Sequence, residues 1–439
     1  MLARIRRITW KTIQLSMALS LFGVTVALAA GGDMDGSFSG DGKVTTGFGT
    51  SFDSQLQDIA QQADGKLVAV GYRMDPLDPS STTRDFVLAR YNTNGSADMT
   101  FSGDSKQRTN FGALDEAYAV AIRLDGKIVV AGQTCNNDFS LCDVAVARYN
   151  TNGSLDTTFS GDGKDTLDFG EGDNGTLGGM FIQPDNKIVI AGYLWNEDDD
   201  YDFAVYRLNA NGGADGSFND DGIQNINFGT DRQDEAFDVV LQGANIVVAG
   251  QTCSATWTDC NFAVARLSLT GGLDSTFSGD GKQVTDFGGN DYAYAMALQP
   301  NDKIVVVGET TASTYGRMAV ARYLTNGSLD GSFSTDGRYT LTFGSRSVAR
   351  AVEMLPNDKI MIAGSTCDAG YFYCDFAMAR LNPGGGLNTA WSGDGKVQID
   401  FGGIDNAETL IEQSDGKLVL GGSRNNGIQV RFAVARVKP

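Results

Sequence analysis

Short apolar runs alternate with polar, glycine-rich stretches along the whole chain, without the helical period of apolar residues. Residues 117–124 alternate small and large side chains, residues 127–131 are nearly continuously apolar, and residues 144–149 form a third apolar run. A fourth run, residues 164–169, follows a longer polar connection. Asp125-Gly126 predicts a two-residue hairpin turn between the first two runs. The pattern indicates an all-β unit of four short strands.

This unit occurs seven times along the chain. Each copy keeps the same order of a Phe-Gly pair, an alanine-rich run, a PDGK-like turn, an IVVAG run and a FAVAR run. The string FSGDG, or a variant of it, starts at Phe38, Phe101, Phe159, Phe218, Phe277, Phe333 and Trp391. Four-stranded units at a period of about 58 residues predict a seven-bladed β-propeller.

The ends of the repeat region are expected to meet. The repeats open with a fourth-type strand, residues 43–48, and close with a third-type strand, residues 432–437. Residues 43–48 would therefore complete the blade made by residues 405–437, which would protect the edge strands of the ring. We expect a single propeller domain over residues 30–439.

The strings LDTTFSGDGK, QPDNKIVIAG and DFAVYRLNANG resemble the bacterial delta-60 repeat family. The resemblance covers essentially all of the chain beyond residue 29. It implies a propeller-like fold and an exported or surface-associated location. It supplies no catalytic residue.

Residues 1–29 read as a signal peptide. Arg4, Arg6, Arg7 and Lys11 precede an apolar stretch over residues 15–28, and Ala27-Leu28-Ala29 offers a small-x-small cleavage site. We therefore expect a secreted or periplasmic bacterial protein whose mature chain does not insert into a membrane.

The composition excludes several kinds of partner and active site. Removing the four positive charges of the signal peptide shifts the formal net charge from −20 to −24, which disfavours nucleic acid and anionic membranes as partners. The chain has no histidine, so Ser-His-Asp and Cys-His sites and imidazole metal sites are excluded. We expect a monomer without a cofactor, with calcium left open.

The cysteines form three pairs with one spacing, each at the same place in its repeat. In an exported chain this arrangement predicts disulfides rather than metal ligands. The expected pairs are Cys135 with Cys142, Cys253 with Cys260, and Cys367 with Cys374.

Two charged patterns recur in the units. An arginine ends the third strand of every unit. These residues are Arg90, Arg148, Arg207, Arg266, Arg322, Arg380 and Arg436. We interpret them as partners of nearby aspartates. Aspartates six residues apart recur at Asp156 and Asp162, Asp274 and Asp280, and Asp330 and Asp336. They could ligate calcium, although Asx-turns explain the same spacing.

The hairpin loops between the second and third strands differ most among the units, and variable loops on a fixed scaffold are where binding usually occurs. We therefore expect the ligand-binding residues on these loops. The candidates are Trp195, Asp198, Asp199, Asp200, Trp257, Asp259, Tyr315, Tyr371, Phe372 and Tyr373.

The leading hypothesis is an exported binding or scaffold protein whose loop face recognises an extracellular glycan or protein. The alternative is a glycoside hydrolase or lyase that uses paired carboxylates, such as Asp198, or Asp234 with Glu235. A third reading is a purely structural surface component.

Overall fold

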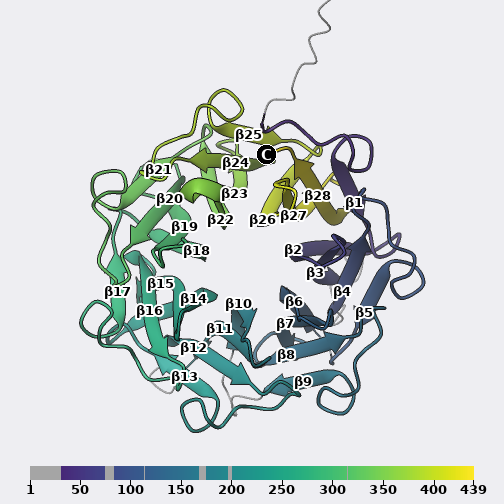
Figure 1. Ribbon diagram of the computed structural model, residues 1–439, viewed down its shortest axis with the longest axis horizontal. Helices are drawn as coiled ribbons and strands as arrows, with labels where there is room; N and C mark the ends of the chain where they lie inside the picture. The colour runs from purple at the N-terminus through teal and green to yellow at the C-terminus, as the bar shows by residue number, and fades with distance from the viewer. Residues whose placement is uncertain (1–30, 75–83, 113, 168–174, 196–199, 314) are drawn as a thin grey trace, which may run out of the picture.

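Strands carry almost all of the regular structure of this all-β protein. The computed structural model describes residues 31–74, 84–112, 114–167, 175–195, 200–313 and 315–439, so the predicted signal peptide lies outside the described residues. In this part of the chain, 28 strands form seven four-stranded units, arranged in a ring around a central axis (Figure 1). The architecture is that of a β-propeller.

The strands take four positions in each unit, from the axis outward. The innermost strands are β2 (Asp53–Gln61), β6 (Leu114–Ile122), β10 (Gly175–Ile182), β14 (Arg232–Gln242), β18 (Asp291–Leu298), β22 (Arg346–Leu355) and β26 (Ile404–Glu412). The second strands are β3 (Leu67–Met74), β7 (Ile128–Cys135), β11 (Ile188–Trp195), β15 (Asn245–Ser254), β19 (Ile304–Thr310), β23 (Lys359–Cys367) and β27 (Leu418–Asn425). The third strands are β4 (Arg84–Tyr91), β8 (Cys142–Tyr149), β12 (Tyr201–Leu208), β16 (Cys260–Ser268), β20 (Arg317–Tyr323), β24 (Cys374–Leu381) and β28 (Val430–Val437). The outermost strands are β5 (Lys106–Thr109), β9 (Lys164–Leu167), β13 (Ile223–Ile226), β17 (Lys282–Thr285), β21 (Arg338–Leu341), β25 (Lys396–Ile399) and β1 (Lys43–Thr46). A short 3-10 turn, Pro356–Asp358, joins β22 to β23.

The N-terminal strand completes the last unit, as the sequence predicts. β1 pairs antiparallel with β28, with Lys43 opposite Ala435 and Thr46 opposite Phe432. The first and last units then pack together in one apolar cluster that holds Leu56 and Val419. The ring is thus joined by side-chain packing between units, while strand pairing runs mainly within each unit.

Each innermost strand contains a β-bulge at the same place. In β6 the pairing with β7 skips from Ala117 to Ala119, so Tyr118 has no partner opposite it. The corresponding skips occur in all seven innermost strands. A bulge bends the strand and redirects a side chain, which here means toward the axis of the ring.

The glycine that ends each IVVAG run makes room for the bulge. A Cβ atom placed on Gly132 would lie 2.0 Å from the backbone oxygen of Glu116, and one on Gly250 would lie 2.0 Å from that of Glu235. Real Cβ atoms do not approach backbone so closely. The repeat therefore needs glycine here for close approach of two backbones.

The hairpin turn after the first strand differs from the expected two-residue turn. The amide of Gly126 donates to the carbonyl of Arg123, and the amide of Arg123 donates to the carbonyl of Lys127. The loop therefore has three residues, and only Gly126 needs a positive φ, of 80°. This is a type I turn followed by a left-handed residue, the common three-residue hairpin.

No helix within the described ranges is long and apolar enough to cross a membrane.

Candidate functional site

The seven bulge residues line a cavity on the axis of the ring. The cavity has a volume of about 220 Å³ and is walled by all seven innermost strands. The bulge residues differ in chemistry from unit to unit. They are Gln57, Tyr118, Gly178, Phe237, Tyr294, Arg350 and Glu408.

Arg350 is the one bulge residue with a positive charge. Its guanidinium lies over the ring of Tyr294, 4.1 Å from the centroid, and its Nε lies 3.9 Å from Oε2 of Glu408. Burial raises the pKa of the Glu408 carboxyl, and the charge of Arg350 partly offsets this. The loose ion pair leaves donors of Arg350 able to bind a ligand oxygen.

Two aspartates of the cavity accept hydrogen bonds from backbone amides. Asp58 accepts the amides of Ile59 (2.8 Å) and Val120 (2.9 Å) and the hydroxyl of Thr409 (2.8 Å), so its carboxylate joins three units. Burial raises the pKa of Asp58 to about 6, although these hydrogen bonds oppose the rise. Asp238 similarly accepts the amide of Met296 from the next unit at 2.7 Å. These carboxylates stabilise the ring and are not free to react.

A groove leads from the loop face to the cavity between the sixth and seventh units. It has a volume of about 330 Å³, within the range of ligand pockets. Tyr371 lies at the loop end, and Arg350 with Glu408 at the axial end. Its remaining lining residues are Arg346, Val348, Ser365, Cys367, Cys374, Ile404 and Asn406.

The loop end of the groove is built around Arg346. Its Nε and Nη2 donate to the two oxygens of the buried Glu309, each at 2.7 Å, in a bidentate pair. Its Nη1 donates to the hydroxyl of Tyr371, and its guanidinium lies 4.9 Å from the centroid of that ring. Glu309 raises the pKa of Arg346 above its usual value, so the guanidinium group stays positively charged. The contacts fix the position of the Tyr371 ring.

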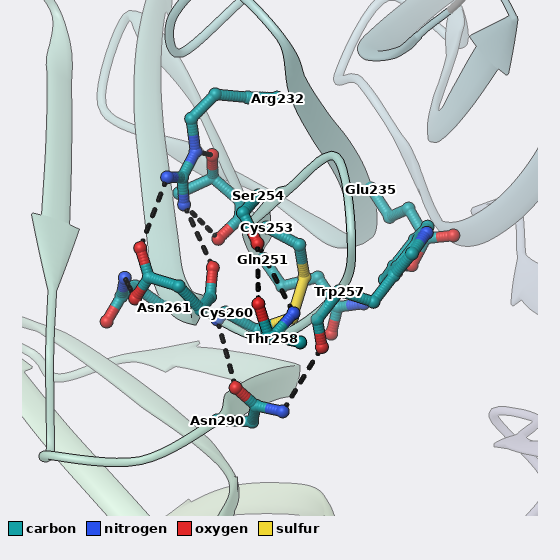
Figure 2. The surroundings of a disulfide bond; sticks show 12 residues. Arg232, Glu235, Gln251, Cys253, Ser254, Trp257, Thr258, Cys260, Asn261 and Asn290 are labelled. Atoms are coloured by element: carbon teal, nitrogen blue, oxygen red, sulfur yellow. Dashed lines mark hydrogen bonds and ion pairs between the residues drawn. A yellow bond between two sulfur atoms is a disulfide. The ribbon is translucent and has the colours of Figure 1, made fainter.

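Tyr371 belongs to one of three disulfide-closed loops. The predicted pairs Cys135–Cys142, Cys253–Cys260 and Cys367–Cys374 are all bonded. Figure 2 shows the second of them, where Asn290 of the next unit donates to the carbonyl of Trp257 at 3.2 Å. Arg232 lies 3.4 Å from the Asp259 carboxylate on the other side. The loop is therefore held by its own disulfide and by neighbouring strands.

An aromatic residue takes a left-handed conformation in each of these loops. Phe139, Trp257 and Tyr371 each follow the first cysteine by four residues, with φ of 59°, 59° and 60°. Each amide closes a turn, as in the 3.2 Å bond from Tyr371 to the carbonyl of Asp368. Glycine is the residue usual at such a position, because Cβ strains this conformation. The aromatic side chains are kept here at a conformational cost, as happens at binding sites.

The other residues predicted for the ligand site are spread over the loop face. Tyr315, Phe372 and Tyr373 are well exposed, and Asp259 is exposed. Trp195 is half-buried against the ring of Tyr201, with centroids 4.8 Å apart, and Asp200 is buried. Asp198 and Asp199 lie outside the described residues. Of the predicted ligand-site residues that the structure describes, Tyr371 is the one that lines the groove.

The aspartates considered for calcium lie in the outer connections and have protein partners. Asp156, Asp274 and Asp330 each receive the Nε of the arginine that ends the third strand, at 2.5 to 2.8 Å. Asp162, Asp280 and Asp336 accept the backbone amide two residues ahead, at 2.9 to 3.0 Å. The predicted arginine pairs and Asx-turns are thus both present, and calcium binding by these carboxylates stays a proposal.

The sequence analysis did not predict the seven bulge residues around the axis. An alignment of the seven units contains a pattern that could have identified them. The residue just before the bulge is Leu or Ala in every unit, whereas the bulge residue ranges from Gly178 to Arg350. When the residue type varies between units at one position while the preceding position stays apolar, the variable side chain is not packed in the core.

The repeats match a known family of domains. Five segments match the family described as "Domain of unknown function (DUF5122) beta-propeller", at residues 62–101, 124–159, 183–218, 299–333 and 413–439. The matches are spread over the chain and support a β-propeller repeat family. No curated protein matches the chain.

Solved structures with a similar arrangement share little sequence with this chain. A protein of unknown function from Dyadobacter fermentans has 9% identity and a TM-score of 0.49, with 90% of this chain and 97% of that chain covered. The polysaccharide lyase Uly1 has 10% identity and a TM-score of 0.46, covering 87% and 89%. The β-propeller domain of the Trilobed protease from Pyrococcus furiosus has 10% identity and a TM-score of 0.43, covering 87% and 93%.

Proposed function

We propose that this chain is an exported seven-bladed β-propeller that binds a glycan in the groove between its sixth and seventh units. The observation that carries the proposal is the groove itself. It places the ring of Tyr371 at one end and the loosely paired Arg350 and Glu408 at the other. Aromatic faces pack against sugar rings, and guanidinium and carboxylate groups bind hydroxyls.

The groove is also pre-organised. Arg346 and Glu309 hold the Tyr371 ring, and the Cys367–Cys374 disulfide closes the loop that carries it. A rigid site loses less conformational entropy when it binds a ligand. Disulfides form in oxidising compartments, which supports the proposed export.

Binding is favoured over hydrolysis by the number of acids in the groove. Glycosidases need two carboxyl groups flanking one bond. Among the described residues that line the groove, Glu408 is the single carboxyl. Asp234 and Glu235 are adjacent on β14, so their side chains point to opposite faces of the sheet. Asp234 accepts the amide of Phe228, and Glu235 accepts the amide group of Gln251.

The proposal is tested on a glycan array with the purified protein. We expect saturable binding to one class of glycan, reduced roughly tenfold or more by Tyr371→Ala and by Arg350→Gln. Phe139→Ala is the matched control, because Phe139 has the same place in the second unit and lies away from the groove. It should bind like the parent protein.

Two further results would change the conclusion. A blank array, or binding that survives both groove substitutions, would contradict the glycan site and leave a protein partner on the exposed aromatic loops as the better candidate. Any glycan that binds should then be incubated with the protein and analysed for new chain ends. We expect none, and their appearance would show an enzyme.

A further inference from the structure

Acid and amide side chains from three fixed repeat positions come together at several of the junctions between units. The three positions are the second residue of the third strand, the residue before the Phe-Gly pair, and the start of the next innermost strand. At the first junction they are Asp85, Asn110 and Asp115. At the junction of the sixth and seventh units they are Asp375, Asp400 and Asp405. The positions are equivalent, so the junctions can be compared directly.

The first junction is neutralised by its own protein groups. Nε atoms of Arg73 and Arg108 lie 3.0 and 2.7 Å from Oδ2 of Asp85, and Asn110 donates to its other oxygen at 2.9 Å. The hydroxyl of Thr134 donates to Oδ1 of Asp115 at 2.6 Å. Two positive charges balance two negative ones, and each carboxylate has hydrogen-bond donors.

The junction of the sixth and seventh units lacks these groups. Thr366 and Gln398 stand where the two arginines stand, and Asp400 replaces the amide. One carboxylate oxygen from each of the three aspartates lies within 4.8 Å of the others. In the described part of the chain, none of the three forms an ion pair with a lysine or arginine. Like charges this close repel one another unless a cation joins them.

A second observation also indicates a ligand. Asp405 is completely buried, and its Oδ1 has no hydrogen-bond partner among the described residues, while Oδ2 accepts the amide of Phe401 at 2.6 Å. Arg424 lies opposite Asp405, where Thr134 lies opposite Asp115, so the hydroxyl donor is lost. Arg424 directs its Nε to the carbonyl of Gly402 at 3.3 Å instead. A buried carboxylate oxygen without a donor favours a cation or a proton as its partner.

We propose that Asp375, Asp400 and Asp405 form a Ca²⁺ site that joins the sixth and seventh units. Carboxylate oxygens are the ligands that Ca²⁺ prefers, and the exposed Asp400 leaves room for water to complete the coordination. The site lies beside the groove, because Cys374 and Ile404 pair in a parallel bridge and both line it. Bound calcium would therefore hold the two walls of the groove together.

Nζ of Lys43 donates to the backbone carbonyl of Asp400 and, among the described residues, forms no ion pair with the three carboxylates. A divalent cation would favour the ionised form of these carboxyl groups.

The test is calorimetric titration of the chelator-treated protein with CaCl2, and separately with MgCl2, beside thermal unfolding. Asp400→Asn and Asp375→Asn copy side chains that other junctions carry as Asn110 and Asn261, so both variants should fold. Asp286→Asn, at the position of Asp400 in another junction, is the matched control. We expect one site with a Kd of roughly 10⁻⁴ to 10⁻³ M, weakened about tenfold or more in the first two variants and unchanged in the control.

The unfolding midpoint of the parent protein should rise with calcium, and that of Asp400→Asn should not. No heat and no midpoint shift up to about 10 mM calcium would overturn the site. Calcium binding that survives Asp400→Asn and Asp375→Asn would also overturn it, and would point to the outer Asp loops. Neither result depends on glycan binding, so this site and the proposed function fail separately.

Discussion

The Nε of Arg90 lies 2.7 Å from Oδ2 of Asp98, with both side chains almost completely buried. The same arginine donates to the carbonyl of Thr151 in the next unit. Asp98 also accepts the hydroxyl of Thr100 at 2.7 Å. The pair therefore ties the outer connection of one unit to its third strand and to the neighbouring unit. Because the repeat supplies such a pair in most units, these pairs help to hold neighbouring units of the ring together.

The sixth unit lacks this pair. Asn388 occupies the aspartate position, and Nε of Arg380 is buried without a partner in the described part of the chain. We expect Asn388→Asp to stabilise the protein by about 1–3 kcal/mol, because it gives the half-buried Arg380 a charged acceptor for its buried Nε. Urea unfolding measures the change. Asp98→Asn, which makes the reverse change in another unit, should destabilise by a similar amount. An Asn388→Asp variant no more stable than the parent would contradict this account.

Acid should weaken the ring through the same pairs. Burial alone would raise the pKa of Asp98, but hydrogen bonds from Thr100 and Lys66 and the charge of Arg90 lower it to about 2. The pKa of Asp35 is lowered to about 2 by its contacts with Ser37 and Arg436, against the same effect of burial. A folded pKa below the unfolded value near 4 means that this stability is complete above about pH 4 and is lost as pH falls toward 2.

The acid prediction has a direct check. Between pH 4 and pH 2, the free energy of unfolding should fall by about 1–2 kcal/mol less in Asp98→Asn than in the parent protein. The measurement is urea unfolding at several pH values in that range. A variant whose stability falls with acid as steeply as that of the parent would show that Asp98 is not an important titrating group.

The strand order was predictable because it depends on repeated local patterns. The sequence predicts that the fourth-type strand at residues 43–48 pairs with the third-type strand at residues 432–437, and β1 does pair with β28. The disulfides were predictable for the same reason, since each cysteine pair has one place in its repeat. The propeller thus follows from periodicity.

The bulge and the groove were not predictable in this way. Tyr118 reads as one more residue of an alternating strand, and only the contact between Gly132 and the Glu116 backbone shows why the pairing skips it. The groove depends on Arg346 of the sixth unit contacting Glu309 of the fifth unit and Tyr371 from a loop 25 residues away. Such contacts depend on how strands and units pack together, which a repeat pattern does not specify.

The bulge glycines should therefore be intolerant of a methyl group. In Gly250→Ala the new Cβ would meet the backbone of Glu235 and Ala236 at 2.0 and 2.7 Å, so one strand must move. We expect destabilisation by about 2–4 kcal/mol in urea unfolding. Gly384→Ala is the control, since no atom of the described residues lies within 4 Å of the position that its new methyl group would take. Equal stability of the two variants would mean that the bulge is not sterically required.

The left-handed conformation of Tyr371 makes a prediction that separates strain from binding. Its φ of 60° is easy for glycine and strained for any residue with a Cβ. Tyr371→Gly should therefore be more stable than Tyr371→Ala by about 1 kcal/mol, although neither keeps the aromatic ring. Both should lose glycan binding equally, because the ring and not the backbone contacts the ligand. Thermal and urea unfolding measure the first effect and the glycan array the second. Equal stability of the two variants would show that the loop relaxes without strain, whereas retained binding in either would remove Tyr371 from the site.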